Sequence, residues 1–487
     1  MTKLIRWKAA CAAAVVVAGA VSAQGQVFTK LVTFNITNGV FPVGALIQGT
    51  DGNLYGTTIG GGATNNGTIF RLTRSGKLST FYSFCAESGC PDGSGPTGLL
   101  LGADGSFYGT TEIGGDSTCE PPRGCGAVFR VTPGGKLTTL HAFEGTDGSF
   151  PYGPPIQGSD GNLYGTAYLG GAYCPATGCG TVFKIATSGV FTTLHSFDST
   201  DGYEPGSLVQ APDGLLYGTT FTGGSRDCDF LPGCGTAFKI TTRGEFTSLY
   251  VFCSQGCEGE AYPSPLALAA DGTFYGATAG DLGEPVGSGS IFQLTSGGTV
   301  SFPYMFGGES NGSNPWGLAQ ATDGNFYGIT LYGGNLICTS YGCGTLFQFT
   351  PAGVLTVLHS FDFTDGAIPE SVMLQATDGK FYGTASYGGY TKFCTEGCGT
   401  VFSLDMGLGP FVAFVQGAGH VGQIGGILGQ GFTGTTSVAL NGTPASFTVV
   451  SDTFIRATVP PGATTGFVTV VTPSGTLTSN VPFRVIR

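Results

Sequence analysis

Residues 51–56 read Asp-Gly-Asn-Leu-Tyr-Gly, and the phrase Asp-Gly-x-(Leu/Phe)-Tyr-Gly recurs six more times in this chain of 487 residues. Successive copies are 52 to 58 residues apart, and each precedes a glycine-rich loop and a short stretch ending in Phe. Such regular self-similarity is typical of repeat architectures, so we interpret the chain as seven related units. The copies begin at Asp51, Asp104, Asp160, Asp213, Asp271, Asp323 and Asp378.

Each unit contains about four short strand-like segments separated by turn residues, which is typical of a β-propeller blade. The composition favours an all-β protein, because 87 glycines, 12% aromatic and only 10% charged residues suit short strands and tight turns. The last unit lacks its final strand, and residues 31–34 (Leu-Val-Thr-Phe) resemble that missing strand. The sequence therefore predicts a seven-bladed β-propeller closed by the N-terminal strand, with a β-solenoid as the competing interpretation.

The units resemble the GloVer tandem repeat of exported bacterial proteins. The resemblance rests on residues 54–58 (LYGTT), 60–61 (GG) and 67–70 (GTIF) and on their six echoes, and it covers roughly residues 27 to 406. The fifth unit departs from it, with Gly280-Asp281 in place of Gly-Gly. The resemblance implies an exported, propeller-like protein.

The repeat pattern stops after residues 408–410, and alternating strands with Gly and Pro turns follow. Residues 429–432 (GQGF), 457–460 (ATVP) and 468–475 (VTVVTPSG) make this stretch similar to an IPT/TIG domain, an immunoglobulin-like β-sandwich. In that family the module serves as a spacer or binding domain. We expect a signal peptide at 1–23, the propeller at 24–406 and the immunoglobulin-like domain at 407–487.

The N-terminus has the pattern of a secretory signal. Lys3, Arg6 and Lys8 precede an apolar run at 9–20 and a small-residue site that ends at Ala23, where we expect cleavage. No later segment has the length of a membrane-spanning helix. We therefore expect a secreted or cell-surface monomer. A formal charge of −12 argues against a nucleic-acid partner, because phosphate neutralisation needs clustered Lys and Arg.

Apart from Cys11, the cysteines fall into seven close pairs, which in an exported chain predict seven local disulfides. Zinc ligation is the weaker alternative, because four ligands would have to converge from pairs on separate units. The predicted pairs are Cys85 with Cys90, Cys119 with Cys125, Cys174 with Cys179, Cys228 with Cys234, Cys253 with Cys257, Cys338 with Cys343, and Cys394 with Cys398.

An up-and-down unit has two unlike ends. The turn face carries the Asp-Gly turns and the short turns between the third and fourth strands, whereas the loop face carries long loops with all fourteen paired cysteines. Function concentrates on loops held by a rigid scaffold, so the loop face is the candidate binding surface. The alternative is that the disulfides only protect long loops from proteolysis. The candidate ligand residues are Trp316, Tyr341, Tyr173, Tyr203, Asp201 and Asp365, and other loop-face side chains include Tyr262, Glu204, Glu370 and Glu396.

No catalytic, cofactor-binding or metal-binding residue is assigned. Residues 308–312 match a nucleophile elbow, but they lie in an inter-unit loop without the strand-turn-helix setting that the motif requires. His141, His195 and His359 alternate with Tyr at one repeat position, which favours packing over metal ligation. The repeated Asp-Gly pairs favour turn capping over calcium binding.

These observations favour a non-enzymatic extracellular protein that binds a glycan or a protein through its loop face. A polysaccharide hydrolase or lyase that uses loop-face carboxylates is one alternative. A structural component of the cell envelope is the other.

Overall fold

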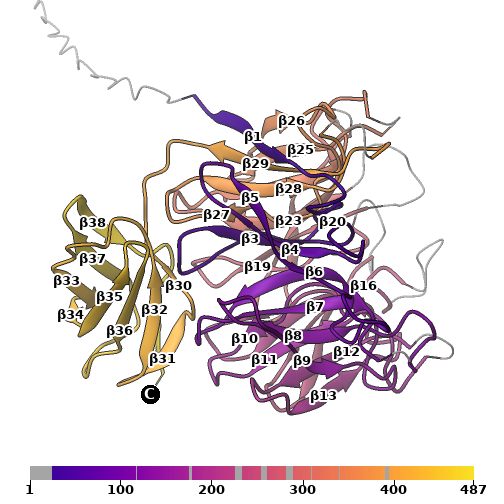
Figure 1. The fold of residues 1–487 in the computed structure, drawn as a ribbon, viewed down its shortest axis with the longest axis horizontal. Helices are drawn as coiled ribbons and strands as arrows, with labels where there is room; N and C mark the ends of the chain where they lie inside the picture. Colours follow the sequence, from indigo (N-terminus) through magenta and orange to yellow (C-terminus); the bar gives the residue numbers. More distant parts are fainter. Residues whose placement is uncertain are drawn as a thin grey trace, which may run out of the picture.

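The computed structural model describes residues 25–116, 118–174, 178–224, 233–253, 260–280, 289–308, 310–338, 341–389 and 394–486. These residues form strands, turns and loops without a helix, so the all-β prediction is confirmed. Seven antiparallel sheets of related build follow one another from residue 27 to 405 in a propeller-like arrangement, and a separate C-terminal unit follows (Figure 1).

Each of the seven sheets is a meander whose opening strand leads into the Asp-Gly turn; in the fourth sheet two short strands take the place of this strand. The first three sheets contain β2 (Ile47–Gln48), β3 (Leu54–Thr58), β4 (Thr68–Leu72) and β5 (Leu78–Ser83); β6 (Ser94–Leu101), β7 (Phe107–Ile113), β8 (Ala127–Val131) and β9 (Leu137–Ala142); and β10 (Ile156–Gln157), β11 (Leu163–Ala167), β12 (Thr181–Ile185) and β13 (Phe191–Ser196).

The next two sheets contain β14 (Tyr203–Pro205), β15 (Val209–Gln210), β16 (Leu216–Thr222), β17 (Thr236–Ile240) and β18 (Phe246–Val251); and β19 (Ala267–Leu268), β20 (Phe274–Thr278), β21 (Ser290–Leu294) and β22 (Val300–Met305). The last two contain β23 (Ser313–Gln320), β24 (Phe326–Tyr332), β25 (Thr345–Phe349) and β26 (Leu355–Ser360); and β27 (Leu374–Gln375), β28 (Phe381–Ala385), β29 (Thr400–Asp405) and β1 (Val27–Thr33).

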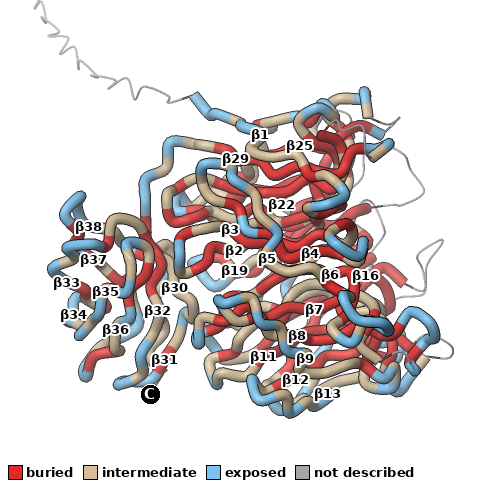
Figure 2. The backbone as a smooth tube through the Cα atoms, viewed as in Figure 1, coloured by how far each residue is buried: buried red, intermediate tan, exposed pale blue. Residues whose placement is uncertain are grey.

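The recurring Gly and Phe of each unit form one packing device. Gly165 in β11 lies opposite Phe183 in β12, and a Cβ on the glycine would come within 2.5 Å of Cζ of that ring. The same cross-strand Gly–Phe pair occurs in all seven sheets. The ring therefore covers a residue that has no side chain, and the second and third strands become the buried middle of each sheet (Figure 2).

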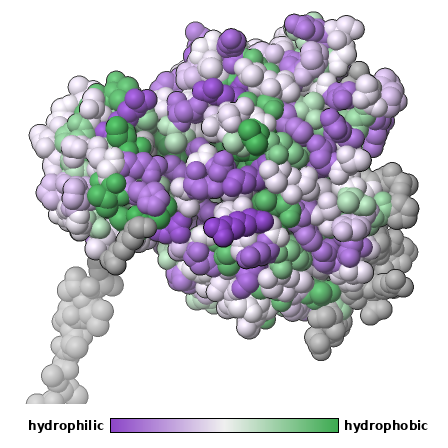
Figure 3. Space-filling model, turned by 90° about the horizontal axis from the view of Figure 1, so that it is seen from below, coloured by the Kyte–Doolittle hydropathy of each residue, from purple (hydrophilic) through white to green (hydrophobic). Residues whose placement is uncertain are grey.

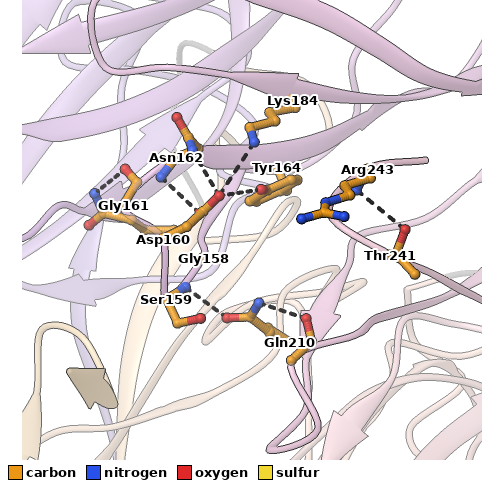
Figure 4. Close-up of polar contacts among 12 residues, drawn as sticks. Gly158, Ser159, Asp160, Gly161, Asn162, Tyr164, Lys184, Gln210, Thr241 and Arg243 are labelled. Carbon is orange, nitrogen blue, oxygen red and sulfur yellow. Dashed lines mark hydrogen bonds and ion pairs between the residues drawn. The ribbon is translucent and has the colours of Figure 1, made fainter. Parts of the chain in front are cut away.

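The recurring Asp and Tyr organise the turn. Oδ1 of Asp160 accepts the backbone N–H of Asn162 at 3.1 Å, and Oδ2 accepts the hydroxyl of Tyr164 at 2.8 Å (Figure 4). The equivalent Asp caps the turn in every unit, and its bond to Tyr is repeated in six. In the fifth unit the hydroxyl of Tyr275 bonds Gln293 instead. Turn capping by the repeated Asp is thus confirmed.

A recurring Gln ties neighbouring sheets together. Oε1 of Gln210 accepts the backbone N–H of Ser159 in the preceding unit at 2.9 Å (Figure 4), while its Nε2 donates to the carbonyl oxygen of Gly214. The equivalent bridges are made by Gln157, Gln320 and Gln375. Gln48 of the first sheet makes the same contact with the last, because its Oε1 accepts the N–H of Thr377 at 2.9 Å. The first and last sheets therefore meet as consecutive sheets do.

The N-terminal strand completes the seventh sheet. β1 pairs antiparallel with β29, from Val27 opposite Asp405 to Thr33 opposite Thr400. The strand begins four residues before the predicted start at residue 31. This pairing covers the outer edge of β29, so the last sheet has the same four-strand composition as its neighbours.

The C-terminal unit is built from two four-stranded sheets and one two-stranded sheet. Buried side chains from both four-stranded sheets, among them Ile427, Ile455, Val438 and Val470, share one hydrophobic cluster. Its strands are β30 (Ala413–Phe414), β31 (Ala418–His420), β32 (Ile424–Leu428), β33 (Ser437–Leu440), β34 (Thr443–Pro444), β35 (Phe447–Ser451), β36 (Phe454–Thr458), β37 (Val468–Thr472), β38 (Gly475–Thr478) and β39 (Arg484–Ile486).

This unit packs on the turn face of the seven sheets (Figure 1). Its contacts reach turns of the first, third, fourth and seventh sheets: Thr453 Oγ1 to Thr50 O at 2.8 Å, Gln416 Nε2 to Gly158 O at 2.9 Å, Arg484 Nη1 to Pro212 O, and Gln430 Nε2 to Thr377 Oγ1 at 2.7 Å. Viewed from below, the sheets beside the unit present hydrophilic residues interspersed with hydrophobic ones (Figure 3). The C-terminal unit thus occupies the turn face and leaves the loop face clear of it.

Candidate functional site

Seven Xaa-Pro segments converge on the loop face, one at the start of each unit. The residue before each proline has a positive φ, between 51° and 67°, although six of the seven are not glycine. Each proline packs on a glycine of the preceding unit; Cδ of Pro151, for example, would lie 2.6 Å from a Cβ at Gly126. Such strained conformations cluster at functional sites. The seven residues are Phe41, Gly95, Phe150, Glu204, Tyr262, Asn314 and Ile368.

The disulfides hold these segments in place. The backbone N–H of Phe150 donates to the carbonyl oxygen of Cys125 at 2.9 Å, and that of Glu204 donates to Cys179 at 3.2 Å. In three more units the second cysteine of the preceding pair accepts the equivalent bond: Cys398 from Phe41, Cys234 from Tyr262, and Cys343 from Ile368. Five disulfide-bonded cysteines therefore position five of the seven Xaa residues.

Five of the seven predicted disulfides are confirmed. They join Cys85 with Cys90, Cys119 with Cys125, Cys174 with Cys179, Cys338 with Cys343, and Cys394 with Cys398. Cys234 is disulfide-bonded, but its predicted partner Cys228 lies outside the described residues, as does Cys257, the predicted partner of Cys253. The pairing of Cys228 with Cys234 and that of Cys253 with Cys257 stay predictions.

The confirmed disulfides indicate an oxidising, extracellular compartment, because such bonds are rare where cellular thiols keep cysteines reduced. No helix in the described part of the chain is long and apolar enough to cross a membrane.

Side chains from non-adjacent sheets meet between these segments. The ring of Phe221 in β16 lies 6.3 Å from that of Trp316 in β23, two sheets further along the chain. Burial raises the pKa of the Tyr152 hydroxyl to about 12, and the negative charges of Glu370 and Glu112 both add to this shift. Phe221 and Trp316 occupy the repeat positions of Glu112 and Glu370, so we treat the two sets of contacts together and call them the axial site: Glu112, Tyr152, Tyr168, Glu204, Phe221, Trp316, Tyr332, Glu370 and Tyr387.

Glu370 is the electrostatic centre of the axial site. Burial raises the pKa of three tyrosine hydroxyls from three different units, Tyr152, Tyr332 and Tyr387, and the charge of Glu370 adds to the rise in all three. Its Oε2 accepts the hydroxyl of Ser386 at 2.8 Å. Burial raises the pKa of the Glu370 carboxyl above its usual range, because a desolvated carboxylate is costly and this hydrogen bond offsets only part of that cost.

Two further carboxyls have the same character. Burial raises the pKa of Glu112, which the charge of Arg123 partly opposes. Burial also raises the pKa of Glu204, which bonds Thr222 and Tyr168. Perturbed carboxyls in a hollow mark candidate functional sites.

A cavity of about 740 Å³ opens beside this group, between the first, second, third and seventh sheets. Phe41 and Phe150 form part of its wall, and Glu112, Arg123 and Glu396 supply its charged groups. The cavity is continuous with the axial site, because it contains Glu112 and because Phe41 lies 5.1 Å, ring to ring, from Tyr387. In the described residues, no group of three or more His, Cys, Asp and Glu side chains is placed to hold a metal ion.

Two of the predicted aromatic candidates lie in or beside the axial site. Trp316 is part of it, and Tyr203 precedes Glu204 and acts on the hydroxyl of Tyr168. Tyr341 is 43% exposed and lies edge-on to Tyr332, with 6.0 Å between the ring centroids. Tyr173 is 57% exposed and lies beside Cys174, at the start of a disulfide loop.

The predicted carboxylates Asp201 and Asp365 support the loops. Each accepts a hydrogen bond from, or pairs with, Nε2 of a histidine at 2.8 Å, His195 and His359 respectively. Their other oxygens accept backbone N–H groups of the same loops. Each histidine ring also stacks on a phenylalanine of the next sheet, Phe246 for His195 and Phe28 for His359, as the packing interpretation predicts.

Sequence reasoning missed Glu112, Tyr152, Tyr168, Phe221, Tyr332 and Tyr387. These residues occupy three repeat positions. Glu112, Tyr168 and Phe221 are the first residue after the Tyr-Gly-x-x segment, Tyr332 and Tyr387 are the second, and Tyr152 follows the Xaa-Pro proline. The sequence did contain an indication of the site, because the residue type at these positions varies from unit to unit while the neighbouring residues repeat.

The fold and the site define a β-rich, propeller-like repeat protein with an elaborated loop face. The model of the Gloeobacter/Verrucomicrobia repeat matches residues 20–231 and 229–443, so the chain belongs to this family. No curated protein matches the chain significantly.

Several solved structures are similar to this chain at low identity. The extracellular domain of a putative hybrid two-component system from B. thetaiotaomicron is 10% identical over 96% of this chain and 60% of that one, with a TM-score of 0.48. A putative gluconolactonase is 16% identical over 63% and 89% of the two chains, with a TM-score of 0.37. The PQQ-bound aldose sugar dehydrogenase of Streptomyces coelicolor is 14% identical over 78% and 98%, with a TM-score of 0.39.

Proposed function

We propose that this chain is an exported, non-enzymatic binding protein whose axial site holds a glycan. In this proposal residues 1–23 are a signal peptide, residues 24–406 form a seven-bladed β-propeller, and residues 407–487 form an immunoglobulin-like domain of the IPT/TIG type. The contacts of Gln48 with Thr377 and of Pro42 with Gly399 support a closed ring, because they repeat between the first and last sheets the contacts made by consecutive sheets.

The observation that carries the proposal is the set of aromatic rings and carboxyls that several sheets contribute to the axial site, of which Glu112 also lines the cavity. Trp316, Phe221 and Tyr152 offer flat apolar surface, and sugar rings pack their C–H faces on such surface. Glu370 and Glu112 offer acceptors for hydroxyl donors. Ligand sites combine apolar walls with a few convergent polar groups in this way.

The C-terminal unit supports the same location for the site. Because it packs against turns of the first, third, fourth and seventh sheets, it occupies the turn face. A large ligand then reaches the axial site from the loop face. This assigns the C-terminal unit a scaffold role in addition to the spacer role expected from sequence.

The test is binding of the exported full-length chain to a panel of soluble polysaccharides, with reducing-sugar release measured on the same panel. We expect binding without release, and we expect Trp316→Ala to weaken binding about tenfold or more, because a stacked aromatic contact is lost. The matched control is Phe467→Ala, an aromatic 46% exposed on the C-terminal unit. If the chain releases reducing sugars and Glu370→Gln abolishes that release, the chain is a hydrolase and the proposal is wrong. Binding to protein partners and to none of the polysaccharides would also overturn the proposal.

A further inference from the structure

The side chains that line the cavity beside the axial site are more acidic than basic, which favours a cationic ligand. The cavity of about 740 Å³ contains two carboxyls, Glu112 and Glu396, against one basic side chain, Arg123. The charges of Glu370 and Glu396 both add to the rise that burial causes in the pKa of Tyr387. Among the described residues, Arg123 is the one basic group that acts on Glu112, Glu204 or Glu370.

The aromatic rings point to the same ligand chemistry independently of the carboxyls. Trp, Tyr and Phe rings attract cations through the negative potential of their faces, and rings that surround a hollow are the usual way in which proteins hold organic ammonium groups. Phe41 and Phe150 line the cavity, and Phe41 packs on Tyr387 beside it. An ammonium group at this place would meet ring faces and carboxyl oxygens together.

The energetic state of Glu370 also favours a cation. This carboxyl is half-buried and accepts a hydrogen bond from Ser386, and no basic side chain of the described residues acts on it. A desolvated carboxylate gains most from a partner that supplies positive charge. A neutral hydroxyl would supply a weaker donor, and a uronic acid, sulfate or phosphate group would be repelled.

We infer that the axial site recognises a glycan with free amino groups, held by its ammonium groups against Glu370, Glu112 and the surrounding aromatic rings. The inference rests on the proposed glycan-binding function and adds the chemical class of the sugar. Its ligands are amino sugars without N-acetyl groups.

The test compares two oligosaccharides that differ in whether their amino groups are free and charged or acetylated and neutral. Calorimetry with the exported full-length chain would measure binding of the β-1,4-linked glucosamine tetramer and of its fully N-acetylated counterpart, slightly below neutral pH. We expect the glucosamine tetramer to bind roughly tenfold more tightly or better. We also expect this preference to shrink as salt is raised.

Variants then locate the preference. Glu370→Gln and Glu112→Gln should each reduce the affinity ratio between the two tetramers toward one. Glu245→Gln, the same chemical change in a turn on the opposite face, should leave the ratio as it is. Unfolding curves for each variant identify any that fails to fold. If one of the Glu112 and Glu370 variants does not fold, the other one provides the test.

The outcomes separate the two proposals. Equal affinity for both tetramers would overturn the amino-sugar inference while supporting glycan binding. Preference for the acetylated tetramer would do the same. Failure to bind either tetramer or any polysaccharide of the panel would overturn the proposed function and this inference with it. A ratio that Glu370→Gln and Glu112→Gln leave unchanged would show that the cation is held elsewhere.

Discussion

Replacing Gln48 by Leu tests the contact between the first and last sheets. Gln48 is 5% exposed and Thr377 is 1% exposed, and the two share two hydrogen bonds of 2.9 Å between the first and last sheets. Leucine fits this repeat position, since Leu101 and Leu268 occupy it in the second and fifth units. The change therefore removes the hydrogen bonds without demanding a new shape.

The expected cost follows from burial. The backbone N–H of Thr377 would lose its acceptor beneath the C-terminal unit, where Gln430 and Phe411 also contact Thr377. A buried donor left unsatisfied costs about 1–3 kcal/mol. Gln157→Leu is the matched control: it removes the same contact from Ala103, which is exposed and can bond water, so it should cost less than about 1 kcal/mol.

Urea unfolding of the wild-type chain and both variants would measure the difference. Gln48→Leu should lower the free energy of unfolding by about 1–3 kcal/mol, and Gln157→Leu by clearly less. Equal losses in the two variants, or no loss in Gln48→Leu, would refute the reasoning. It holds that the C-terminal unit buries the turn at Thr377 and that Gln48 accepts the backbone N–H of this residue.

Two further predictions concern the site. Replacing Cys119 and Cys125 by Ala opens a loop of sequence separation 6 and should lower the free energy of unfolding by about 2 kcal/mol. Because Cys125 positions Phe150, the affinity for a glycan should also fall. In the control, replacing both Cys85 and Cys90 by Ala should lower the free energy of unfolding and leave the affinity unchanged. Unchanged affinity in both variants would leave the disulfides a purely protective role. Burial raises the folded-state pKa of Glu370 above its unfolded value. At a pH between the two pKa values, the folded state therefore binds more protons than the unfolded state does. As the pH rises through this range, Glu370 lowers the free energy of unfolding. Glu370→Gln should therefore stabilise the chain at neutral pH, and the gain should disappear below the unfolded pKa; a gain that is independent of pH in urea unfolding would contradict this origin.

Much of the fold is local, and local patterns are what a sequence displays. The phrase Asp-Gly-x-(Leu/Phe)-Tyr-Gly contains its own turn cap, its Tyr partner for the Asp carboxylate and the glycine that the opposing Phe requires. Cysteines four to six residues apart, such as Cys394 and Cys398 or Cys338 and Cys343, can reach each other within one loop. The all-β class, the repeat, the strand that completes the last sheet and five disulfides were therefore predictable.

The axial site was decided by tertiary structure. Glu112, Tyr152 and Glu370 lie in three different units, and they meet because the sheets are arranged around a common centre, which brings equivalent positions of distant units together. Asp201 and Asp365 instead contact the histidines six residues before them in the same unit, His195 in β13 and His359 in β26, and are therefore not part of the axial site. Sequence by itself determined which residues build each unit, because those contacts span a few residues. Which residues of different units meet depends on distances between sheets, and only the assembled structure sets those.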